Sequence, residues 1–244
     1  MLIDELLTYL FDGQPHSLTE PMGTWLRSSR RFTAFVGSFR NKIRKKLRVT
    51  QDPETLHDLR LELETAYLLL QERSLSLFYE PEHSRQVRSP DFAVTYTTSL
   101  TFMLEVTRLR AVSKTETLSL NNGASPEEER LADAICSKLG QFLAQRGNVL
   151  IVGVDALHLT QSDLQALMLR VQQRAERNDS AFWQRYGFRE RADFFQHYQR
   201  LSEILVRTSR LQTNEPAIVW VNPRAKHPLP SKVRTVLHRS HTAD

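Results

Sequence analysis

Hydrophobic residues recur at helical spacing over much of the chain, and short stretches of alternating polarity lie between the helical segments. Segment 27–48 carries apolar residues three and four positions apart, which form one face of a helix: Phe32, Phe35, Val36, Phe39, Ile43 and Leu47. A second helix is predicted to begin at Pro53, with Asp52 as its N-cap. Glu62 and Glu64 lie on opposite flanks of its apolar stripe, so either could reach over the edge of an underlying sheet.

The middle of the chain changes to the short alternating runs that are typical of strands. Three such runs are predicted at 75–81, 91–97 and 100–109, followed by a helix that Ser125 caps within 124–145. Segment 148–154 is continuously apolar, which predicts a buried, parallel, central strand. A helix at 161–176, one or two aromatic-rich helices within 181–207 and a last strand at 216–223 complete the pattern.

This order of elements predicts an α/β fold with a three-layer core. We expect an N-terminal helical region at 1–50, a core at 51–222 with a helical insertion at about 180–210, and a basic tail at 223–244. Only 8 glycines and one cysteine, Cys136, disfavour glycine-rich phosphate loops, internal disulfides and thiolate metal clusters. The composition, together with the lack of an apolar run of membrane length, predicts a cytoplasmic protein that does not enter a membrane.

The positive charge is concentrated in two segments. The chain has 33 basic and 28 acidic residues, a net charge of +5, yet 27–48 alone holds nine basic residues and no acid. The tail from Arg224 to Arg239 adds five more, so the rest of the chain is acidic. Unopposed charge at this density attracts a phosphate backbone, and nucleic acid, chiefly DNA, is the predicted partner. The predicted contacts are Arg40, Lys42, Arg44, Lys45 and Lys46.

Two carboxylates come together if Thr97, Thr98 and Ser99 form a hairpin loop. Tyr96 then pairs with Leu100, and counting outwards places Asp91 opposite Glu105 on the same face. Carboxylates about 5 Å apart repel each other, and a fold that keeps them there usually has a cation between them. Their hard oxygens suit Mg²⁺ or Mn²⁺ rather than zinc.

The Ser-Pro-Asp91-Phe stretch and the later apolar-apolar-Glu105-Val-Thr107 stretch resemble the two halves of the PD-(D/E)xK, or restriction-endonuclease-like, nuclease motif. The resemblance covers about residues 52–178 and implies a core of helix, three antiparallel strands, helix and strand, here with added N-terminal and C-terminal helices. It also implies that Asp91 and Glu105 bind one or two divalent metals for phosphodiester hydrolysis, with Glu62 as the helix-borne acid. Glu64 fits that last role almost as well.

The sequence departs from this motif at Thr107, where the family carries a lysine that orients the attacking water. A hydroxyl cannot supply a positive charge. Lys138 is the candidate replacement, because the helix that carries it should pack beside the sheet, and Lys114 is a weaker one. The alternative is a catalytically inactive nuclease fold that binds nucleic acid or a protein. A third hypothesis is an interaction module that docks its partner through the aromatic region 182–195.

Overall fold

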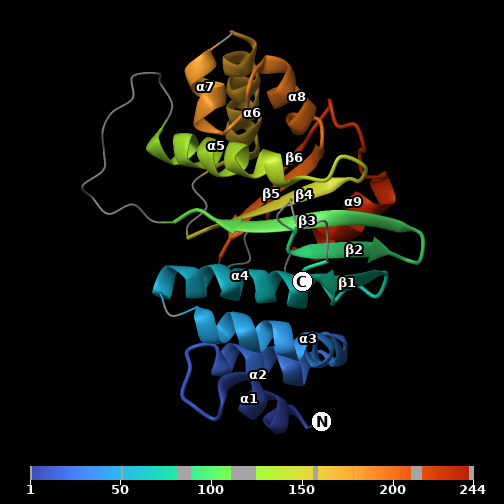
Figure 1. The fold of residues 1–244 in the computed structure, drawn as a ribbon. Coiled ribbons are helices and arrows are strands. Elements are labelled where there is room, and N and C mark those ends of the chain that lie inside the picture. Colours follow the sequence, from blue (N-terminus) through green and yellow to red (C-terminus); the bar gives the residue numbers. More distant parts are fainter. Residues whose placement is uncertain are drawn as a thin grey trace.

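The computed structural model describes residues 2–50, 52–81, 89–110, 125–155, 159–177, 179–209 and 216–241. These residues form a mixed α/β fold in which a six-stranded sheet carries helices on both faces (Figure 1). The predicted fold class is confirmed at this level. Of the described helices, none has the length and apolar character that a membrane span requires.

The six strands lie in the sheet in the order in which they occur in the sequence. They are β1 (Leu75–Tyr79), β2 (Phe92–Tyr96), β3 (Leu100–Arg108), β4 (Asn148–Val154), β5 (Leu201–Thr208) and β6 (Ile218–Val221). β1, β2 and β3 pair antiparallel, β3, β4 and β5 pair parallel, and β6 returns antiparallel to β5. Tyr96 pairs with Leu100, which confirms the predicted hairpin register.

The two faces of the sheet are covered by different parts of the chain (Figure 1). One face holds α5 (Pro126–Lys138), the short 3-10 helix η1 (Leu139–Gln141), α6 (Gln161–Glu176), α7 (Ser180–Arg185) and α8 (Arg191–Tyr198). The other holds α1 (Ile3–Phe11), α2 (Thr19–Ser28), α3 (Arg30–Val49), α4 (Pro53–Leu69) and α9 (Ser231–Arg239). The predicted added helices at both ends of the chain are therefore present, and α9 forms within the segment expected to be a basic tail.

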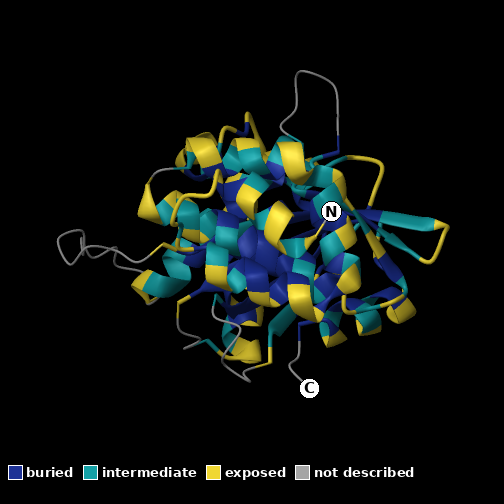
Figure 2. Ribbon diagram, turned by 90° about the horizontal axis from the view of Figure 1, so that it is seen from below, coloured by how far each residue is buried: buried dark blue, intermediate teal, exposed yellow. Residues whose placement is uncertain are grey.

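Helix α4 is enclosed between the sheet and the N-terminal helices. Asp52 caps it by accepting a hydrogen bond from the Thr55 N–H at 2.9 Å, as predicted. Helices α1 to α3 form a further layer beneath α4, with their exposed faces turned outwards (Figures 1 and 2). The flanks of α4 are therefore buried as well as its apolar stripe, and Glu62 and Glu64 are only 8% and 0% exposed.

Glycine permits close packing of α4 on the sheet. A Cβ atom at Gly153 of β4 would lie 2.5 Å from Leu61 Cδ2, so a larger residue would force the Leu61 side chain to move. This contact holds the middle of α4, one residue from Glu62, directly against the central strand.

Residues 201–208 differ from the prediction, because they form strand β5 rather than part of a helical insertion. Glu203 and Arg207 are four residues apart, a spacing that resembles the polar face of a helix. In the strand both are buried, and each has an ionic partner on another element. His238 of α9 lies 2.9 Å from Glu203, and Glu64 of α4 lies 3.4 Å from Arg207. Long-range pairing thus permits charged residues in a buried strand.

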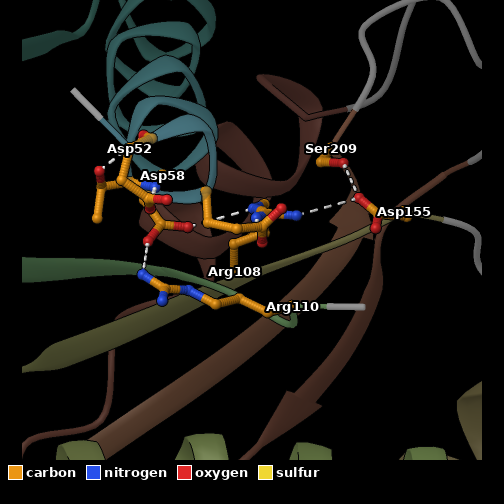
Figure 3. A network of polar contacts seen from close by, with 8 residues as sticks. Asp52, Asp58, Arg108, Arg110, Asp155 and Ser209 are labelled. Atoms are coloured by element: carbon orange, nitrogen blue, oxygen red, sulfur yellow. Dashed lines mark hydrogen bonds and ion pairs between the residues drawn. The ribbon is translucent and has the colours of Figure 1, made fainter. Parts of the chain in front are cut away.

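An arginine at the end of β3 fixes the first turns of α4 to the sheet (Figure 3). The Arg108 side chain is only 4% exposed and forms ion pairs with Glu54 and Asp58 of α4 and with Asp155, which follows β4. The Nε–Asp58 distance is 3.2 Å and the Nη1–Asp155 distance is 3.4 Å. Arg110 also pairs with Asp58, at 2.7 Å, but its side chain is 53% exposed.

This network predicts that replacing Arg108 destabilises the protein more than replacing Arg110. We expect Arg108→Met to lower the free energy of unfolding by about 1–2 kcal/mol, because it removes a buried guanidinium that pairs with three partly exposed carboxylates. The matched change Arg110→Met removes an exposed pair and should cost less than about 1 kcal/mol. Urea unfolding followed by circular dichroism measures both, and equal losses would contradict the role given to Arg108.

Candidate active site

The predicted carboxylate pair lies where β2 and β3 stop pairing with each other. The ladder ends at Phe92 and Leu104, and the next step places Asp91 opposite Glu105. There Asp91 Oδ2 accepts a hydrogen bond from the Val106 N–H at 2.8 Å, so a side chain binds the β3 backbone beyond the last strand pair. β3 continues as a partner of β4 as far as Arg108. Asp91 therefore lies at the point where β2 and β3 diverge, and we call this position the fork.

Lys138 reaches this fork from α5, as the sequence predicted. Its Nζ atom lies 2.7 Å from Glu105 Oε1, and the two side chains are 15% and 5% exposed. Lys138 is the last residue of α5, whose start is fixed by a capping box between Ser125 and Glu128. Thr107, two residues beyond Glu105 on β3, is half-buried. An ammonium group thus contacts Glu105 from α5 rather than from position 107 of β3.

Glu62 faces the fork, and Glu64 does not. Both oxygens of Glu62 accept hydrogen bonds from Lys46 Nζ of α3, at 2.8 and 3.1 Å. Glu64 instead pairs with Arg207. Of the two glutamates, Glu62 is the one whose charge acts on Asp91.

Glu80 is a site residue that the sequence analysis missed. Its Oε1 atom lies 2.8 Å from Lys46 Nζ, and its backbone N–H donates to the Asp91 carbonyl oxygen at 2.8 Å. The register of β1 and β2, in which Tyr79 pairs with Phe92, places Glu80 beside Asp91. The segment between β1 and β2 is too long to fix this register from the sequence, so no sequence signal identified Glu80.

Negative charge is crowded in the fork. Burial raises the pKa of Asp91 well above its ordinary value, and the charges of Glu62 and Glu105 raise it further. The Val106 N–H and the Lys46 ammonium oppose this rise without cancelling it. Burial also raises the pKa of Glu62, against the attraction of Lys46. Burial disfavours the charged form of Lys46, but its acidic neighbours, Glu62 first, more than offset this and raise its pKa.

The carboxylate oxygens of the fork are suitable ligands for a hard divalent cation, but their positions do not surround a single point. Glu62, Asp91 and Glu105 offer carboxylate oxygens, and a cation would offset the repulsion that Glu62 and Glu105 exert on Asp91. Within the described ranges, however, no three acidic, histidine or cysteine side chains are grouped closely enough to hold one metal ion. Lys46 and Lys138 bind two of the three carboxylates instead.

Much of the predicted nucleic-acid surface on α3 is used for contacts within the protein. Lys42 Nζ donates to the Glu80 carbonyl oxygen at 2.8 Å, Arg44 pairs with Asp12, and Lys46 lies in the fork. Arg40 and Lys45 are exposed, although the Arg40 guanidinium also lies 5.7 Å from the centre of the Tyr9 ring. The outward positive charge of α3 is therefore smaller than its sequence indicates.

The remaining candidates lie outside the fork. The aromatic residues of 182–195 contribute mostly to the core, with Phe182, Trp183, Phe188 and Phe194 buried. Cys136 is buried, and this burial raises the pKa of its thiol. Lys114 lies outside the described residues. A cavity of about 760 Å³ beside the Arg108 network is lined by none of Glu62, Asp91, Glu105, Thr107 or Lys138.

Comparison with known proteins gives no further guide to this site, since no family model, curated protein or solved structure matches the chain.

The charge crowding predicts a pH-dependent gain in stability for Asp91→Asn. An acid whose pKa is raised by folding destabilises the protein increasingly as pH rises above its unfolded value, about 3.9, towards its folded value. Asparagine keeps an acceptor for the Val106 N–H and removes the charge. In EDTA we expect the variant to exceed the wild type by about 1 kcal/mol at pH 8 and to match it near pH 4.

Urea unfolding at both pH values measures this difference, with Asp4→Asn on the exposed face of α1 as the control. A loss of stability in Asp91→Asn at pH 8 would contradict the account of the fork.

Proposed function

We propose that this protein is a metal-dependent, nuclease-like enzyme that hydrolyses DNA phosphodiester bonds, with a restriction-endonuclease-like core. The observation that carries the proposal is the 2.7 Å contact between Lys138 and Glu105 at the fork that also holds Asp91. A carboxylate pair with an ammonium group beside it contains the charges that this reaction requires.

The order of elements supports the proposed core. Helix α4, the antiparallel strands β1 to β3, helix α5 and strand β4 follow one another as the motif resemblance implies. β4 is parallel to β3, so α5 crosses over one face of the sheet and ends with Lys138 at Glu105. A lysine on α5 can therefore replace one on β3, because its ammonium group reaches Glu105 from the other element.

Each residue of the fork has a distinct role in the proposed reaction. Asp91 and Glu105 would hold Mg²⁺ or Mn²⁺, with Glu62 as a further ligand once Lys46 releases it. The metal, when bound, would supply an activated water and stabilise the leaving oxygen. The Lys138 ammonium donates hydrogen bonds, so it would orient the attacking water and offset the charge that develops on the phosphate. The Thr107 hydroxyl can contribute a hydrogen bond but no charge.

DNA remains the proposed substrate, with a revised binding surface. Arg40 and Lys45 are the exposed members of the five residues predicted on α3. They would contact phosphates and position the backbone without reading the sequence of bases. Lys46 belongs to the fork rather than to this outer surface.

The second candidate is a catalytically inactive relative of the same fold that binds nucleic acid. Two observations favour it: Thr107 stands at the motif's lysine position, and lysines already neutralise Glu62 and Glu105. Such a protein would bind DNA in a salt-dependent manner and would not cleave it.

Moving the lysine from position 138 to position 107 tests the proposed enzymatic activity. We expect the wild type to cleave plasmid or single-stranded DNA in Mg²⁺ or Mn²⁺, and Lys138→Met to reduce the rate about 100-fold. Adding Thr107→Lys to Lys138→Met should restore part of the rate, because it returns an ammonium group to the same face of β3. Asp91→Asn and Glu105→Gln should be inactive.

Equal cleavage by all of these proteins would identify a contaminating nuclease and remove the proposal. Full activity of Lys138→Met, with Asp91→Asn inactive, would remove Lys138 from the mechanism. Salt-dependent DNA binding without cleavage by the wild type would establish the second candidate instead.

A further inference from the structure

We infer that Lys46 is an internal cation lock, which holds Glu62 away from metal binding until the ammonium group is displaced. This inference rests on the proposed function, because it concerns the same carboxylates. It assigns to Lys46 a positioning role that differs from the DNA contact its sequence context suggests.

The ammonium group of Lys46 lies between two acidic side chains. Its Nζ atom lies 2.8 Å from Glu62 Oε1 and 2.8 Å from Glu80 Oε1, and 5.0 Å from the centre of the Tyr79 ring. Two carboxylates and the face of an aromatic ring are all attractive to a positive charge. The three partners come from α4 and from the end of β1, so the lysine connects the helix to the sheet edge next to Asp91.

Glu80 itself shows that the chain adopts an unfavourable conformation at this point. Its φ angle is +43°, in the left-handed region that a residue with a Cβ atom seldom adopts. In that conformation its backbone N–H binds the Asp91 carbonyl oxygen while its side chain binds Lys46. A strained backbone that persists beside a group of charged residues is typical of a functional position.

An ammonium group and a divalent cation cannot share Glu62 without mutual repulsion. Because Lys46 Nζ lies within hydrogen-bond distance of both Glu62 oxygens, a metal held by Asp91 and Glu105 would meet its positive charge at Glu62 unless Lys46 moves away. Lys46 can leave, since its side chain is 30% exposed and its four-carbon stem is flexible. The lysine and the metal therefore compete, and anything that draws Lys46 outwards, such as a DNA phosphate, would strengthen metal binding by the same coupling.

Direct titration with Mn²⁺, followed by the electron paramagnetic resonance signal of the free ion, tests this competition without measuring activity. We expect Lys46→Met to bind Mn²⁺ about tenfold more tightly than the wild type, within the usual range of coupling between two sites. Lys232→Met removes the same charge from an exposed position on α9 and should leave the affinity unchanged. Adding Glu62→Gln to Lys46→Met should remove the gain.

Circular dichroism and thermal melting establish that each variant is folded, and Lys46→Gln provides a second neutral replacement if Lys46→Met does not fold. Lys46→Arg retains the charge and should bind Mn²⁺ as the wild type does. Unchanged or weaker binding by the folded neutral variants would overturn the lock, even if the wild type cleaves DNA.

The lock and the proposed function fail in distinguishable ways. Tighter Mn²⁺ binding by Lys46→Met without DNA cleavage by any protein would support the lock and contradict the enzyme. Absence of Mn²⁺ binding from both the wild type and the neutral variants would overturn the lock together with the metal dependence of the proposed reaction.

Discussion

Crowding of buried negative charge at the fork between β2 and β3 is the constraint on which the arrangement of this protein depends. Asp91 leaves the strand ladder and binds the Val106 N–H, which brings its carboxylate among Glu62, Glu80 and Glu105. Buried carboxylates at such proximity are stabilised either by cations or by a proton on one of them, and the raised pKa of Asp91 reflects this crowding together with burial. The protein supplies cations from two directions, from α3 on one face of the sheet and from α5 on the other.

This charge crowding must be offset by stabilising contacts elsewhere. Helix α4 carries Glu62 to the fork and is held there by close contact with Gly153 and by the ion pairs of Arg108 at its N-terminal end. The N-terminal helices enclose its other side. A rigid scaffold around an unfavourable cluster of charges is a common arrangement in active sites, where stability is lost for function.

Local periodicity predicted most of the helices and strands, and it predicted that Asp91 and Glu105 lie together. Asp91 and Glu105 could be paired from the sequence because side chains in strands alternate with a period of two and a short hairpin sets the register. The choice between Glu62 and Glu64 could not be made, since α4 is buried on nearly all sides and its stripe does not show which flank faces the fork. Strand β5 was predicted as helix, because Glu203 and Arg207 find their partners on distant elements. The contacts of Lys46 within the protein were missed for the same reason, since its acidic partners lie far away in the chain.

The central claim is that the fork is a cation site built from Asp91 and Glu105. The most direct measurement is anomalous X-ray scattering at the manganese edge from crystals grown with Mn²⁺. We expect a peak within bonding distance of carboxylate oxygens of both residues, with Lys46 moved off Glu62 wherever Glu62 is also a ligand. Ordered Asp91 and Glu105 side chains in a saturated crystal, with no peak between them, would contradict it.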